Sequence, residues 1–100
     1  MAHAATTLGL PARLTLAEAR AVTAGLGAQL AAAPQGGVLV VDGGQLGHFD
    51  SSALAVLLEL QRRAAASGRL LRAERMPARL AELATLYGVA GLLGMGAPPA

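Results

Sequence analysis

The sequence predicts a layered α/β domain, in which a small mixed β-sheet is packed against helices. The main indication is the alternation of short apolar runs with longer helix-like segments along the chain. Val38-Leu39-Val40-Val41 is wholly apolar, mostly β-branched and flanked by glycines, as expected for the central strand of a sheet with both faces covered. Residues 53–66 contain no helix breaker before Ser67-Gly68, which predicts a helix that ends there.

The part of the chain before this strand predicts one strand and one helix. Residues 4–10 are weakly apolar and lead into Pro11, which is typical of a short strand followed by a turn. Thr15 and Glu18 have the spacing of a capping box, so we expect a helix to begin at Thr15 and to stop before Pro34. The apolar stripe of this helix consists of Leu16, Ala19, Val22, Leu26 and Leu30.

The part after residue 68 repeats the pattern of strand and helix. Residues 70–75 predict a shorter strand. Pro77 is favourable in the first turn of a helix, which we expect to run to Tyr87 and to end at Gly88. Apolar residues between 89 and 93 predict a last turn that packs back onto the core.

Length and composition indicate one domain, spanning residues 1–100. Hydrophobic residues make up 54% of the chain and charged residues only 14%, which favours a folded domain with surface that contacts a partner. No apolar run approaches the roughly 18 residues of a membrane span. Residues 1–10 lack the basic and apolar regions of a signal peptide. We therefore expect a soluble, cytoplasmic protein.

Catalytic and metal sites are disfavoured by the side chains that the chain carries. It has no cysteine, and His3 and His48 lack the spacing of metal ligands. Asp42, Asp50 and Ser51 lie near His48 in sequence, but nothing beyond this proximity indicates a hydrolytic triad. Neither glycine pair, Gly36-Gly37 or Gly43-Gly44, has the spacing of a phosphate-binding loop. We expect no catalytic residues, no cofactor and no enzymatic activity.

The eight arginines and the absence of lysine give a net charge of +2. Most arginines lie between residues 62 and 79, where no aromatic side chain is available to stack on bases. Nucleic-acid binding is therefore not expected. We interpret the arginines as a solvated rim, partly neutralised by Glu59, Glu74 and Glu82.

The most specific indication lies in residues 46–58, which read Leu-Gly-His-Phe-Asp-Ser-Ser-Ala-Leu-Ala-Val-Leu-Leu. This segment resembles the signature of STAS domains, in which an apolar strand and a short loop lead to an aspartate, a serine or threonine, and a helix. Residues 38–42, 67–72 and 83–93 fit the same frame, and the resemblance covers about residues 8–94. The family includes anti-sigma-factor antagonists, the tails of sulfate transporters and a subunit of the lipid-asymmetry (Mla) transporter.

The resemblance implies a role in protein binding. In the family, the residue after the aspartate, here Ser51, is phosphorylated by an anti-sigma kinase, and the following helix meets the partner with the adjoining loop. Ala53 stands where antagonists usually carry glycine, and residues 4–15 leave little room for the hairpin with which many relatives open. Both differences disfavour an antagonist. Tyr87-Gly88 is more similar to the corresponding segment of Mla-type subunits.

The implied function is therefore that of a subunit that binds the ATPase of a phospholipid-transport ABC complex and stabilises or regulates it. Such a subunit is peripheral to the inner membrane through its partner. The alternative is an anti-sigma-factor antagonist that is regulated by phosphorylation of Ser51 and binds an anti-sigma kinase. Homodimer formation is left open.

The helix that follows Asp50 has more apolar surface than one contact with a sheet requires. Residues 53–58 are apolar all round, and the stripe that contains Leu54 and Leu57 can face the sheet. The rest of its apolar surface is covered either by a partner or by neighbouring helices of the domain. Residues 50–52 either dock a partner or serve only as helix caps. The expected partner-binding residues are His48, Phe49, Asp50, Ser51, Ser52, Ala53, Val56 and Leu60.

Overall fold

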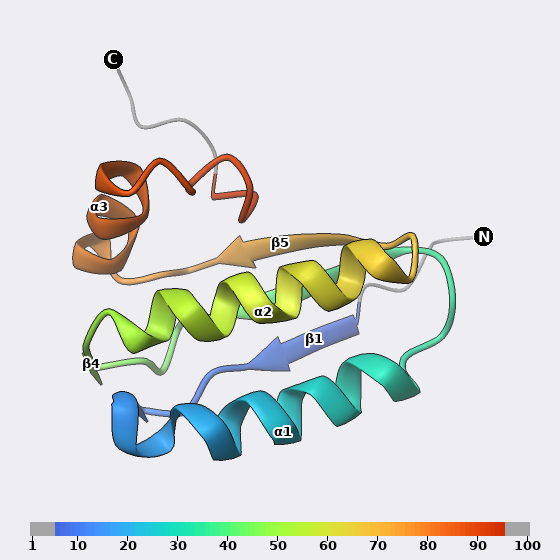
Figure 1. Ribbon diagram of the computed structural model, residues 1–100, viewed down its shortest axis with the longest axis horizontal. Helices are drawn as coiled ribbons and strands as arrows, with labels where there is room; N and C mark the ends of the chain where they lie inside the picture. The colour runs from blue at the N-terminus through green and yellow to red at the C-terminus, as the bar shows by residue number, and fades with distance from the viewer. Residues whose placement is uncertain (1–5, 96–100) are drawn as a thin grey trace.

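The computed structural model describes residues 6–95, in which each helix follows one or two strands along the chain (Figure 1). The strands are β1 Thr6–Gly9, β2 Arg13–Leu14, β3 Val38–Asp42, β4 His48–Phe49 and β5 Leu70–Glu74, and the helices are α1 Leu16–Ala32, α2 Ser52–Ala66 and α3 Ala78–Leu86. The predicted α/β class is confirmed. His3 and the first two residues of the predicted N-terminal strand lie outside the described residues.

β3 is the central strand of a three-stranded sheet with the order β1-β3-β5, as predicted. Val41 of β3 lies opposite Leu8 of β1 on one side and opposite Ala73 of β5 on the other. All pairs in residues 6–95 are parallel, including that of the separate two-stranded sheet β2-β4, so no antiparallel pair contributes to the expected mixed sheet. Parallel neighbours require crossover connections, which α1 and α2 provide.

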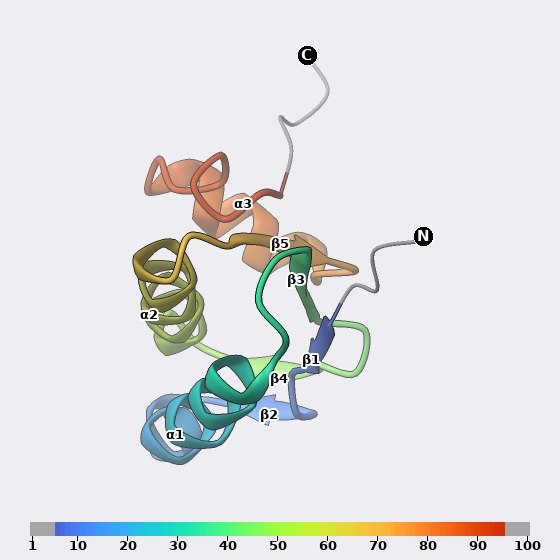
Figure 2. The same cartoon turned by 90° about the vertical axis from the view of Figure 1, so that its right-hand side faces the viewer.

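The two faces of the three-stranded sheet differ in burial. Leu39 and Val41 point to the inner face and are buried, and α1 and α2 both lie on one side of this sheet (Figure 2). Val38 and Val40 point the other way and are only half-buried. The expectation that this strand is covered on both faces therefore holds fully for the inner face and only in part for the outer face.

The predicted helix ends are close to those in the structure. α2 stops where Gly68 adopts a φ of 72°, a left-handed conformation that glycine reaches without strain. α3 begins directly after Pro77 and ends one residue before Tyr87. The predicted final turn packs back through Leu93, which is fully buried, whereas Leu92 stays 55% exposed.

The second apolar stripe of α2 belongs to the domain's own core. Ala53 and Leu60 have no exposed surface, and Val56 is 2% exposed. α2 contacts α1 as well as β5 and α3, so neighbouring elements of the same domain cover both of its stripes. The expectation that these three side chains meet a partner is therefore wrong, and the alternative of internal packing holds.

One arginine of the expected solvated rim is buried. Arg69 is 6% exposed, and its Nε donates to Ser67 Oγ at 3.0 Å while its Nη1 donates to the Ala33 carbonyl at 3.3 Å. Ala33 and Ser67 are the C-terminal caps of α1 and α2. Arg69 thus holds a positive charge between the negative ends of two helix dipoles, which accounts for its burial.

Replacing Leu60 by alanine should lower the free energy of unfolding by about 2–5 kcal/mol, because it deletes a fully buried side chain and leaves a cavity. The matched control is Leu70→Ala, at a position that is 72% exposed and should change stability little. Urea unfolding followed by circular dichroism measures both. Equal, small effects would mean that the Leu60 side chain lies on the surface.

Candidate functional site

The predicted site lies where two short parallel strands lead into two helices. β2 and β4 pair so that Leu14 lies opposite Phe49. The next residues along the two strands are Thr15 and Asp50, at the starts of α1 and α2. The pairing therefore places the two helix beginnings side by side. We call residues 15–16 and 50–52 the cap junction.

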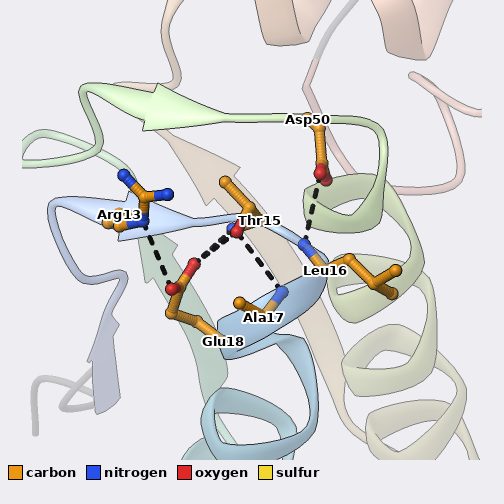
Figure 3. Close-up of polar contacts among 6 residues, drawn as sticks. All are labelled: Arg13, Thr15, Leu16, Ala17, Glu18 and Asp50. Carbon is orange, nitrogen blue, oxygen red and sulfur yellow. Dashed lines mark hydrogen bonds and ion pairs between the residues drawn. The ribbon is translucent and has the colours of Figure 1, made fainter.

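Asp50 connects the two helices at the cap junction (Figure 3). Its Oδ1 accepts a hydrogen bond from the Ser52 amide at 2.8 Å, and its Oδ2 accepts one from the Leu16 amide at 3.2 Å. The hydrogen bond from the Ser52 amide, with smaller contributions from the Ser52 side chain and the Leu16 amide, holds the pKa of the Asp50 carboxyl below its ordinary value. One ionised carboxylate thus caps the first turns of both helices.

The predicted capping box at the start of α1 is confirmed. Thr15 Oγ1 accepts from the Ala17 amide at 3.3 Å, and Glu18 Oε1 accepts from the Thr15 amide at 2.8 Å (Figure 3). Arg13 adds an ion pair to Glu18 at 3.3 Å. The Thr15 hydroxyl and amide are the largest causes that lower the pKa of Glu18. These contacts fix the backbone that presents the Leu16 amide to Asp50.

Ser51 is left free by this arrangement. Its backbone is already helical, with φ −63° and ψ −14°, and its side chain makes no capping hydrogen bond. The residue is exposed at the start of α2. Of the caps expected in residues 50–52, Asp50 therefore acts as the cap, and the Ser51 hydroxyl is accessible from solvent.

Leu16 contributes apolar surface to the cap junction. The stripe of α1 predicted this residue to be buried, but it is 77% exposed, whereas Leu26 and Leu30 of the same stripe are buried. Leu16 is the first residue of α1, and nothing in the sequence pattern distinguishes it from the rest of the stripe. Sequence reasoning therefore missed this residue as a candidate for the site.

The remaining predicted site residues lie around the junction with unequal exposure. His48 is exposed, Ser52 is half-buried, and Phe49 is half-buried and packed against the core. A hollow of about 470 Å³ lies beside β4, between residues 46–49 and 77–79. The structure thus brings together the polar residues of the predicted set, while its three apolar helix residues are buried as described above.

The described residues offer no metal-binding group. Within residues 6–95, no three His, Cys, Asp or Glu side chains gather closely enough to hold a metal ion. In the same part of the chain, none of the helices has the length and hydrophobicity needed to cross a membrane.

Replacing Asp50 by alanine should destabilise the domain because both helix amides lose their acceptor, and asparagine should be milder because it keeps an oxygen. Since the folded pKa lies below the ordinary 3.8, the contribution of Asp50 is fully present above about pH 4 and is lost as the pH falls through the folded value. Urea unfolding at about pH 7 and about pH 2 measures this. If the free energies of unfolding of wild type and Asp50→Ala differ by the same amount at both pH values, the capping role is contradicted.

Comparison with known proteins gives one family match. The model of a family described as "Mlab, STAS domain" matches residues 1–94. A search of curated proteins finds no match. The matched region contains both strands and both helices that form the cap junction, together with the whole three-stranded sheet. Because the match spans nearly the whole chain, this protein belongs to the STAS domain family.

Proposed function

We propose that this STAS domain is a non-catalytic subunit that docks through its cap junction on the ATPase of a phospholipid-transporting ABC complex and stabilises or regulates it. The observation that carries the proposal is the exposure of Ser51 and Leu16 at one hydrogen-bonded junction of two helices. The Mlab description of the matching family supports the choice of partner.

The hydrogen bonds at the junction favour a protein partner over a small anion. The Leu16 and Ser52 amides are already bound to Asp50, and the Ala17 amide is bound to Thr15. A free anion would therefore compete with an existing carboxylate for these donors. A protein instead gains from the apolar surface of Leu16 and from the polar rim at His48 and Ser51, without displacing any cap.

Co-purification tests the docking role. A tagged chain, expressed in its own cells, should retain an ABC ATPase, and Leu16→Arg should reduce the retained ATPase roughly ten-fold because an apolar anchor at the centre of an interface is replaced by a charge. The matched control is Leu70→Arg, on the outer face of β5, which should retain the ATPase. Circular dichroism melting establishes that both variants are folded.

Two results would contradict this role. One is a wild-type chain that purifies without any ATPase while the transporter is intact. The other is an equal loss of the ATPase in the two leucine variants, since the two side chains lie on different elements and only Leu16 belongs to the cap junction.

A phosphorylation switch is the second candidate, and the free hydroxyl of Ser51 favours it. A phosphate at Ser51 would add a charge of about −1.5 to −2 next to the Asp50 carboxylate. The two like charges would repel, so the phosphate would weaken the link between α1 and α2.

Ser51→Asp should then release an anti-sigma kinase, whereas Ser51→Ala should keep it bound. Pull-down with the kinase and mass spectrometry of the native protein measure this. Native protein without phosphate, together with ATPase retention that is unchanged in Ser51→Asp, would exclude the switch and leave the transporter role.

A further inference from the structure

A hollow of about 430 Å³ lies between α1 and α2, one turn from the cap junction. The two helices lie side by side in both views (Figures 1 and 2). The rim of this hollow carries two guanidinium groups, Arg20 from α1 and Arg63 from α2. The rest of its lining consists of Ala19, Thr23, Ala24, Ala55 and Val56. We call this hollow the helix groove.

Positive charge is concentrated at the helix groove. Arg62 and Arg63 share one carboxylate, that of Glu59, at 2.7 and 2.8 Å. Arg20 makes no ion pair within residues 6–95, whereas Arg13, Arg72 and Arg75 each pair with a carboxylate of their own. Arg20 and Arg63 line the groove, and together with the neighbouring Arg62 and Glu59 of α2 they carry a charge of about +2, as large as the net charge of the whole chain.

Arg63 is held in place across the groove. Its Nε donates to Glu59 at 2.8 Å, and its Nη1 lies against Gly27 of α1, where a Cβ atom would be only 2.1 Å away. The absence of a side chain at Gly27 is therefore what allows the guanidinium to reach over α1. Arginine has five N–H donors, and only the Nε donor of Arg63 is committed to Glu59, so others remain for a ligand.

We infer that the helix groove receives an acidic α-helix of the partner protein, whose carboxylates pair with Arg20 and Arg63. This inference rests on the proposed docking function and extends the same face from the cap junction along α1 and α2. The exposed Ala24 and Ala55 leave room for a third helix at the usual interaxial distance of about 8–10 Å. Two carboxylates on the face of such a helix that enters the groove can pair with the arginines on its two walls.

The probe is a helical peptide of about 15 alanine-rich residues that carries two glutamates four positions apart. It is titrated into the isotope-labelled full chain while amide chemical shifts are recorded. The expected shifts centre on Arg20, Ala24, Ala55 and Arg63, and binding should weaken as salt is added. A peptide with glutamine in place of both glutamates should not bind.

Arg20→Gln should weaken peptide binding about three-fold, the effect of losing one exposed ion pair. The matched control is Arg72→Gln, which removes an exposed arginine on β5 that pairs with Glu74, and it should leave binding unchanged. Arg63→Gln should act like Arg20→Gln. Because Arg63 also packs against Gly27, the melting temperature of the Arg63→Gln variant is measured as well. If that variant unfolds, Arg20→Gln still decides the test.

Shifts that appear only outside the groove, equal binding of the glutamine peptide, or equal weakening by Arg72→Gln would overturn the inference. Tighter binding of single-stranded DNA than of the acidic peptide would overturn it as well. These outcomes can be distinguished from a failure of the docking function, because the titration contains only the chain and the peptide, whereas docking is tested by co-purification of the ATPase. ATPase retention that is lost in Leu16→Arg but unaffected by Arg20→Gln would reject the groove while leaving the cap junction as the docking site.

Discussion

The fold depends on one carboxylate that serves two helices. Asp50 accepts the Ser52 amide of α2 and the Leu16 amide of α1, which lies 34 residues earlier in the chain. Helix dipoles place about half a positive charge at each helix start, so two adjacent starts amount to roughly one unit of charge. A single ionised aspartate balances that charge, and it also fixes how the two helices meet. Because Asp50 provides the cap, the neighbouring Ser51 is free to face solvent.

Arg69 has the complementary role at the other end of the helices. Its guanidinium contacts the C-terminal caps of both α1 and α2, Ala33 and Ser67. The negative ends of the two helices are therefore compensated by one cation, as the positive ends are by one anion. This pairing explains why an arginine is buried in a domain whose described ion pairs otherwise lie at its surface. It also means that the charge presented to a partner comes mainly from side chains such as Arg20 and Arg63.

Much of this architecture could be predicted from the sequence, because the relevant signals are local. A capping box, a glycine with a left-handed φ and a β-branched run each act within a few residues, and they placed α1, α2 and β3 correctly. β2 and β4 were missed because two-residue strands have no periodicity to detect. They exist because Arg13 and His48 are brought opposite each other by the rest of the fold.

The candidate site was predicted in part for the same reason. Asp50 and Ser51 could be found because a capping motif and a family signature coincide there. Val56 and Leu60 were assigned to a partner because helical periodicity counts apolar stripes but does not identify the neighbour that covers each one. In the structure that neighbour is internal. Leu16 shows the opposite error, since a residue in phase with a buried stripe can still project beyond the end of the core.

The parallel pairing of every described strand has a consequence for how the chain assembles. Strand partners are 32 to 35 residues apart, from Val38 with Leu70 to Arg13 with His48, and no pair forms from adjacent segments through a tight turn. Helices can form from local contacts, but the sheet requires long loops to close first. During synthesis on the ribosome, β1 waits without its partner until β3 has emerged, and β3 then waits for β5. Early release or truncation before residue 70 would therefore leave a strand edge open to other chains.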